Sequence, residues 1–127
     1  MSRSLIAIAS ANGFLAVTLG AFAAHGMEDI LSTESLATFQ TGVEYHMYHA
    51  LALFGSALLA LHYPQEQLPR RSAYLFLLGI LFFSGSLYIL CLSGIGWVGA
   101  ITPIGGLFFL AGWATLFWFG VSSKPKR

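Results

Sequence analysis

The chain has 127 residues, of which 57% are hydrophobic and only 9% are charged. A soluble domain is nearer a quarter charged and could not bury so much apolar surface at this length, so the composition excludes an ordinary water-soluble domain. The net charge of +1 argues against a nucleic-acid binder, and the single cysteine, Cys91, excludes a disulfide framework. The sequence therefore predicts an integral membrane protein whose main partner is the lipid bilayer.

Four stretches meet the requirement for a membrane-crossing helix, which is about 20 mainly apolar residues. They are residues 5–24, 43–62, 72–93 and 99–121. Continuous apolar runs are typical of helices, because a helix satisfies its own backbone hydrogen bonds in lipid. We therefore predict an all-α fold, a four-helix bundle that forms a single transmembrane domain over residues 1–127.

The links between these stretches carry turn and cap signals. Pro64 would end the second helix, and the glycines at 94 and 96 mark a tight turn before the fourth. In the link of residues 25–42, Ser32 or Thr33 is a suitable N-cap, with Glu34 in the first helical turn. We predict a short interfacial helix there, with Gly42 as a hinge; a helix that runs on into the second span is the alternative.

The basic residues predict the orientation. With four crossings all six fall on one side of the membrane, and that side carries Arg3, Arg70, Arg71, Lys124, Lys126 and Arg127. The other side carries Glu28, Asp29 and Glu34. Because cytoplasmic loops are enriched in lysine and arginine, we expect both termini in the cytoplasm.

The first stretch also has some features of a cleaved secretory signal. Arg3 precedes an apolar run that contains Ala21-Phe22-Ala23, an A-x-A pattern. We expect the segment to be retained, because the small residues Ala16, Gly20 and Ala24 recur every four positions, as in a helix packed closely on another helix.

Polar side chains gather at the head of the second span and the end of the first. Ionisable groups at membrane depth are costly, so they are functional hypotheses by default. The candidate cluster comprises His25, His49, Gln40, Asn12, Glu44, His46 and Tyr48. We place this layer toward the non-cytoplasmic face, with Asn12 deeper. We expect His25 and His49 to face the bundle interior within reach of Asn12, Gln40 or Glu44.

Helix geometry argues against a metal site on this helix alone. His46 and His49 lie about 60° apart around the axis, whereas Glu44 lies about 140° to 160° from either. Gln40, Glu44 and Tyr48 form one stripe, and a second stripe contains Phe39, Gly42, His46 and His49. We therefore predict a hydrogen-bonded cluster of neutral histidines, with no metal and no cofactor. Metal or haem ligation and a proton or small-solute pathway are the alternatives.

The remaining polar residues favour structural roles. We expect Ser84, Ser86 and Ser93 to hydrogen-bond within their own helix, and Tyr88 to pack and bond across helices. No Ser/His/Asp or Cys/His arrangement and no phosphate-binding glycine pattern is present. The sequence therefore predicts a protein that is not an enzyme.

Several segments carry a family resemblance. They are Asn12-Gly13, the Gly-Ala-Phe-Ala-Ala-His-Gly run of residues 20–26, the run of residues 39–53, Ser-Gly-Ser-Leu-Tyr at 84–88, Thr-Pro-Ile-Gly-Gly at 102–106, and Gly112-Trp113. With these segments the chain resembles the YgdD/YwdK-like family of small bacterial inner-membrane proteins, a domain-of-unknown-function family. The resemblance implies a four-helix protein of the bacterial inner (plasma) membrane. Relatives often carry glutamine at positions 44 and 46, so the resemblance favours His25 and His49, with Asn12 and Gln40 as polar partners.

Two classes of function follow. The first is a non-enzymatic membrane protein that acts through helix packing, as a homo-oligomer or as an accessory to a membrane complex. The small-residue stripes Ala16, Gly20, Ala24 and Ala52, Ser56, Ala60 support it. The alternative is a small transporter or channel that uses the cluster of His25, Glu44, His46 and His49.

Overall fold

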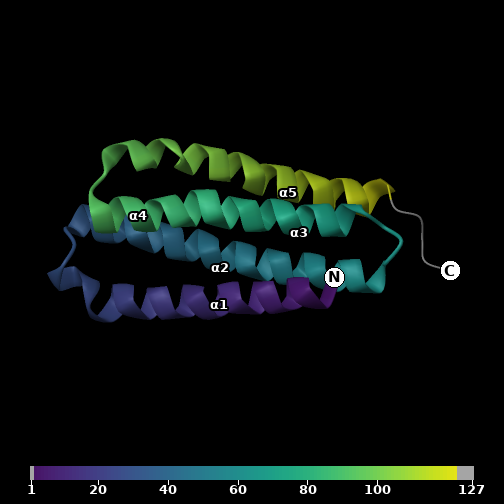
Figure 1. Cartoon of the computed structure of the whole chain (residues 1–127), viewed down its shortest axis with the longest axis horizontal. Helices are drawn as coiled ribbons and strands as arrows, with labels where there is room; N and C mark the ends of the chain where they lie inside the picture. Colours follow the sequence, from purple (N-terminus) through teal and green to yellow (C-terminus); the bar gives the residue numbers. More distant parts are fainter. Residues whose placement is uncertain (1, 123–127) are drawn as a thin grey trace.

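The structure is a computed structural model that describes residues 2–122, and it is all-α over this range. The helices are α1 (Ser2–His25), α2 (Thr33–His62), α3 (Leu68–Gly79), α4 (Gly85–Ser93) and α5 (Thr102–Ser122). A π-helical segment, η2 (Ile80–Ser84), joins α3 and α4 into one continuous rod. Two short 3-10 helices, η1 (Met27–Asp29) and η3 (Gly96–Ala100), lie in the links. The predicted four-helix bundle is confirmed (Figure 1).

The four rods lie side by side in chain order, with α2 between α1 and α3 and the α3–α4 rod between α2 and α5 (Figure 1). The start of α1, the α2–α3 link and the end of α5 lie at one end of the bundle. This basic end carries Arg3, Arg70 and Arg71. The opposite end carries Glu28, Asp29 and Glu34. The remaining predicted cations, Lys124, Lys126 and Arg127, lie outside the described residues.

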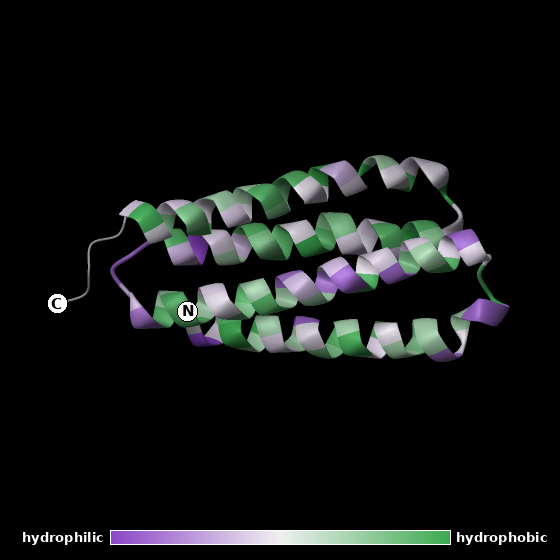
Figure 2. Ribbon diagram, turned by 180° about the vertical axis from the view of Figure 1, so that it is seen from behind, coloured by the Kyte–Doolittle hydropathy of each residue, from purple (hydrophilic) through white to green (hydrophobic). Residues whose placement is uncertain are grey.

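Within residues 2–122, three helical stretches are long and apolar enough to cross a membrane: Arg3–His25, Leu68–Ser93 and Gly96–Ser122. Helix α2 has 30 residues and so has the length to cross. Its hydropathy is lower because polar side chains occupy its middle (Figure 2). These polar side chains include Glu44, His46 and His49.

Helix α2 begins earlier than the predicted second span. Ser32 is its N-cap, with the Oγ accepting a hydrogen bond from the Ser35 amide at 3.1 Å. From Thr33 the helix continues through Gly42 to His62, just before Tyr63-Pro64. The alternative of a helix that runs on is therefore the observed one, and Gly42 is not a hinge. Only η1 remains as a short helix between the first two rods.

Glycines set the contact between α5 and the α3–α4 rod. A Cβ atom on Gly105 would lie 2.2 Å from the backbone nitrogen of Phe83 in η2. Gly79 and Gly112 likewise lie directly under the rings of Phe109 and Phe76. Because these positions lack side chains, α5 approaches the rod closely, as is common in membrane bundles.

An apolar core fills the half of the bundle nearer the basic end. It consists of Leu5, Ala9, Leu53, Ala57, Ala73, Phe76, Ile80 and Phe109. A buried serine pair lies beside it, where the hydroxyls of Ser72 and Ser56 are hydrogen-bonded at 3.0 Å and join α3 to α2. Small residues also bring α1 onto α2, since a Cβ on Gly20 would lie 3.2 Å from Val43.

Candidate functional site

His46 lies near the middle of α2 and hydrogen-bonds to two other helices. Its Nε2 is 3.0 Å from the Oδ1 of Asn12 on α1, and its Nδ1 is 2.9 Å from the hydroxyl of Tyr88 on α4. The Asn12 Nδ2 donates to the carbonyl of Ile8 at 2.8 Å, which orients the amide so that Oδ1 faces His46 as an acceptor. His46 Nε2–H therefore donates to Asn12, and a neutral ring accepts the Tyr88 hydroxyl proton at Nδ1. The network ties three helices together.

Gly42 lies one turn before His46 and lets α4 approach α2. A Cβ at Gly42 would lie 3.0 Å from Cε1 of Tyr88. The Ser84 Oγ donates to the Gly42 carbonyl at 2.8 Å. The prediction that Ser84 bonds within its own helix is wrong, because this close approach offers it a carbonyl of α2 instead. The prediction for Tyr88, which packs and bonds across helices, is confirmed.

His49 lies one turn further along α2 and joins it to α5. Its Nδ1 donates to the Tyr45 carbonyl at 2.8 Å, and its Nε2 accepts from the indole N–H of Trp113 at 3.1 Å. Since a carbonyl only accepts and an indole only donates, this arrangement specifies a neutral ring with its proton on Nδ1. The ring stacks on Phe109, with centroids 3.5 Å apart and planes at 10°.

The two predicted stripes of α2 face in different directions. Phe39, Gly42, His46 and His49 are buried. Gln40, Glu44 and Tyr48 are exposed. The candidate residues therefore do not form one cluster.

Asn12 and His46 come together, whereas His49 binds groups that the sequence did not pair with it. His25 is exposed at the end of α1 and does not face the interior as predicted. It lies about 180° around α1 from the buried residues Ala16 and Ala23, so its side chain is on the side of the helix that faces away from α2.

The buried polar layer lies near the middle of the bundle, not toward the non-cytoplasmic end. The reason is the early start of α2 at Thr33, which shifts His46 and His49 toward the centre of the helix. Asn12, which was expected to lie deeper than the histidines, lies level with His46 because it also falls near the middle of its helix.

Among residues 2–122, no three His, Cys, Asp or Glu side chains come together as a metal site would require. Both ring nitrogens of His46 and of His49 already have hydrogen-bond partners. The arrangement can hold helices in register through neutral hydrogen bonds. Sequence reasoning missed Trp113 and Phe109; the available signal was the Trp113 indole, whose N–H needs an acceptor when it packs inside a membrane bundle.

The His46 network gives a stability prediction. His46→Leu should lower the free energy of unfolding by about 1–2 kcal/mol, because Asn12 Oδ1 and the Tyr88 hydroxyl both lose their partner. Tyr88→Phe should lower the free energy of unfolding less in the His46→Leu background than in the unchanged protein. The measurement is a double-mutant cycle by detergent-titrated unfolding in mixed micelles, with the exposed Tyr48→Phe as control. Strict additivity of the two changes would show that the bond between His46 and Tyr88 contributes nothing.

Sequence comparison identifies the family. A family described as "Protein of unknown function (DUF423)" matches residues 19–106. The chain belongs to the DUF423 family. It is 42% identical over 124 residues to a UPF0382 membrane protein of Haemophilus influenzae, covering 98% of both chains. It is 46% identical over 111 residues to the UPF0382 membrane protein YwdK of Bacillus subtilis, covering 87% of this chain and 90% of that protein.

A third relative extends the comparison to an inner-membrane protein. The chain is 38% identical over 125 residues to the UPF0382 inner membrane protein YgdD of Escherichia coli K12, covering 98% of this chain and 95% of YgdD. These findings confirm the resemblance to the YgdD/YwdK-like proteins. No solved structure matches.

The DUF423 match contains the central residues of both hydrogen-bond networks. His46, His49 and Tyr88 lie inside the matched range, whereas Asn12 and Trp113 lie outside it. This chain is thus an integral membrane DUF423 protein in which the matched core binds through its histidines to both outer helices.

Proposed function

We propose that this DUF423 protein is non-enzymatic and acts by packing one face of α1 and α2 against another membrane-protein chain, as an oligomer or as an accessory to a complex. We call this the α1–α2 face and define it by Gly20, Ala23, Gln40, Glu44 and Tyr48. The observation that carries the proposal is the position of Glu44.

Glu44 lies two residues from His46, near the middle of α2, yet it points out of the bundle. It makes no hydrogen bond or ion pair with any residue of the described range 2–122. An acidic side chain near the centre of a membrane helix costs about 2.5–3.5 kcal/mol on insertion scales. A polar group of another chain that covers Glu44 would offset this cost.

The surroundings of Glu44 suit a contact with another helix. A groove of about 340 Å³ is lined by Gly20, Ala23, Gln40, Val43 and Glu44. Gln40 and Glu44 are one turn apart on the same stripe, so their polar ends can be reached together. Small residues on the α1 side leave room for a neighbouring side chain.

Four of the six residues in the small-residue stripes that first suggested oligomer contacts are used inside the chain, whereas Ala24 is exposed and Ala52 is half-buried. Ala16 and Ala60 are buried, Gly20 lies against Val43, and Ser56 bonds to Ser72. A contact with another chain is therefore supported by the exposed stripe of Gln40, Glu44 and Tyr48 and not by the small-residue stripes.

A transporter or channel is the alternative, and the interior gives it less support. A path from the histidine layer to the basic end would have to pass through the apolar core that contains Leu53, Ala57 and Phe76. Ionisable groups on such a path would line a water-filled cavity. The packed aliphatic and aromatic side chains favour a structural role for His46 and His49.

For the topology we propose that all four rods cross the inner membrane, with both termini in the cytoplasm. Support comes from the gathering of Arg3, Arg70 and Arg71 at one end of the bundle, opposite Glu28 and Asp29. The relative YgdD is named as an inner membrane protein, which agrees with this placement.

Disulfide cross-linking tests the α1–α2 face. In a Cys91→Ser background, Gln40→Cys should form a disulfide-linked species in native membranes under a mild oxidant. Leu110→Cys, at an exposed site on α5, should not. Cys91→Ser preserves the bond to the Ser35 carbonyl, since a hydroxyl also donates.

The size of the linked species separates a second copy from another protein. Glu44→Leu in the Gln40→Cys background should reduce cross-linking, because the carboxyl no longer needs a polar partner. Equal cross-linking from positions 40 and 110, or none from either, would contradict the proposal.

A further inference from the structure

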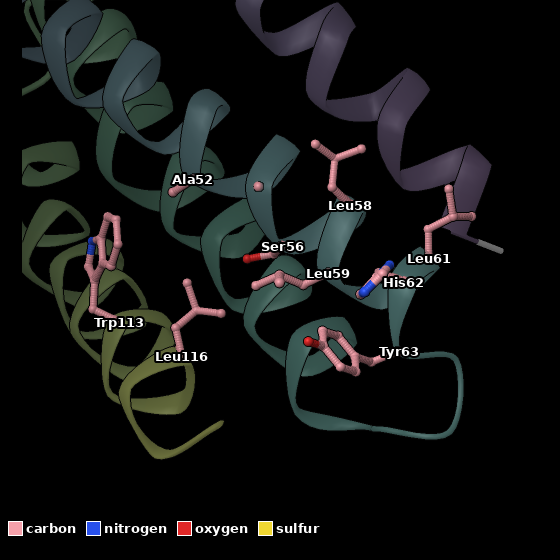
Figure 3. Close-up of a pocket in the computed structure, with 10 residues that line it drawn as sticks. Ala52, Ser56, Leu58, Leu59, Leu61, His62, Tyr63, Trp113 and Leu116 are labelled. Carbon is pink, nitrogen blue, oxygen red and sulfur yellow. The ribbon is translucent and has the colours of Figure 1, made fainter. Parts of the chain in front are cut away.

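A second groove lies between α2 and α5, in the half of the bundle nearer the basic end (Figure 3). Its volume is about 850 Å³, within the range of about 300–1,000 Å³ that is typical of ligand pockets. It is lined by Ala52, Gly55, Ser56, Leu58, Leu59, Leu61, His62, Tyr63, Trp113 and Leu116. Its walls are mainly aliphatic. Trp113 lies toward one end, His62 and Tyr63 lie toward the other, and Ser56 lies between them.

Aromatic contacts between α2 and α5 bound the groove at both ends. At one end Trp113 donates its indole N–H to His49 at 3.1 Å. At the other end the rings of Tyr63 and Phe119 meet edge to face, with centroids 5.5 Å apart. Between these contacts the two helices do not close on each other.

The hollow exists because α2 contributes small residues to this part of its wall. Ala52, Gly55 and Ser56 form this part of the wall. A Cβ on Gly55 would meet no atom within 4 Å. In membrane bundles such residues usually admit a neighbouring backbone, so an unfilled small-residue wall leaves room for another apolar occupant.

The shape of the groove favours a flexible chain over a helix. A helix with its side chains is about 10–12 Å across and lies along a groove that is open at its ends. In this groove the His49–Trp113 and Tyr63–Phe119 contacts lie at the two ends, and over Ala52 to His62 it extends about 15 Å along α2. A lipid acyl chain can bend into such a space, and aliphatic walls match its chemistry.

The polar end of the groove suits an anionic headgroup. His62 and Tyr63 lie there, and the start of α3 is held beside the groove wall because Ser72 bonds to both Ser56 and the Pro69 carbonyl. Arg70 and Arg71 follow directly in the sequence. Within residues 2–122 the Arg70 Nε is shielded from solvent and has no hydrogen-bond partner. Arginines at the end of a membrane helix can hold the headgroup of an anionic phospholipid.

We propose that the α2–α5 groove is a binding site for an anionic phospholipid. One acyl chain occupies the groove between the His49–Trp113 and Tyr63–Phe119 contacts, and the phosphate lies at the basic end near Arg70 and Arg71. Gly55 of this site lies on the same side of α2 as Glu44 but 11 residues further along, about 16 Å nearer the basic end. The site also lies toward α5, whereas the α1–α2 face lies toward α1.

Trp113 lines the groove and serves as the reporter. The full chain with Trp97→Phe and Trp118→Phe keeps Trp113 as its only tryptophan. It is reconstituted into phosphatidylcholine vesicles that contain either phosphatidylglycerol or phosphatidylcholine with brominated acyl chains, at equal mole fraction. Brominated phosphatidylglycerol should quench Trp113 more strongly, with up to about 30-fold enrichment at the site from two arginines.

Three variants locate the bound lipid. Gly55→Leu should fill the groove and remove the excess quenching, whereas Gly120→Leu on α5, where a Cβ also meets nothing within 4 Å, should leave it unchanged. The double change Arg70→Gln and Arg71→Gln should remove the preference for phosphatidylglycerol. Helix content by circular dichroism verifies that each variant is folded.

Three results would overturn the proposal. Equal quenching by the two brominated lipids would show that the groove takes bulk lipid without selecting the headgroup. Absence of quenching by either lipid would show that protein covers the groove. Excess quenching that survives in folded Gly55→Leu would place the lipid elsewhere.

Discussion

Gly105→Ala should destabilise the bundle by about 3 kcal/mol or more, because a single methyl group forces α5 away from the α3–α4 rod. The added Cβ would lie 2.2 Å from the Phe83 nitrogen and 2.6 Å from the Phe82 carbonyl carbon. Both are backbone atoms of η2, so no side-chain rotation can relieve the overlap. The free energy of unfolding in mixed micelles measures the effect.

Gly106→Ala is the matched control for this change. Gly106 is the next residue of the same helix, and there a Cβ would lie 3.9 Å from the Phe83 ring, an ordinary contact. Its effect on stability should stay within about 0.5 kcal/mol. Similar losses from the two substitutions would mean that α5 does not rest on η2 through Gly105.

His49→Ala should lower the free energy of unfolding by about 2–4 kcal/mol. The change removes the ring stacked on Phe109, leaves a cavity, and takes the acceptor from the Trp113 indole. With Trp113 as the only tryptophan, its emission should shift to shorter wavelength, since its N–H loses a hydrogen bond. Detergent-titrated unfolding and the emission spectrum measure the two effects.

His49→Phe separates packing from hydrogen bonding. Its ring can still stack on Phe109, so it should recover part of the stability while the emission shift persists. His25→Ala is the histidine control and should change stability by less than about 0.5 kcal/mol, because His25 is exposed. A loss at His25 as large as the loss at His49 would contradict the assigned positions of the two side chains.

Local signals in the sequence located the ends of the elements well. Pro64 follows the end of α2, Ser32 caps its start, and Gly94 adopts φ 72° at the end of α4. These features depend on one or two residues and on backbone preferences that hold in any surroundings. The turn after Gly94 was expected, whereas the 3-10 helix η3 that follows it was not.

The predicted layer of seven polar residues failed for a tertiary reason. The sequence could not distinguish a hinge from a continuous helix at Gly42, because glycine is common both at bends and where two helices approach closely. In the structure Gly42 admits Tyr88, and α2 continues past it. The continuous helix keeps His46 near its middle, level with Asn12 and far from His25 at the end of α1.

By itself the sequence determined that the protein is an all-α membrane bundle, and it also determined which side chains of α2 share a stripe. Both follow from composition and from the fixed angle of about 100° between successive helical residues. Only the tertiary structure decided which stripe is buried, because burial depends on the rods that pack against each side. In the structure His46 bonds to Asn12 and Tyr88, and His49 bonds to Trp113. Glu44 is exposed on the opposite side of α2 from the two histidines.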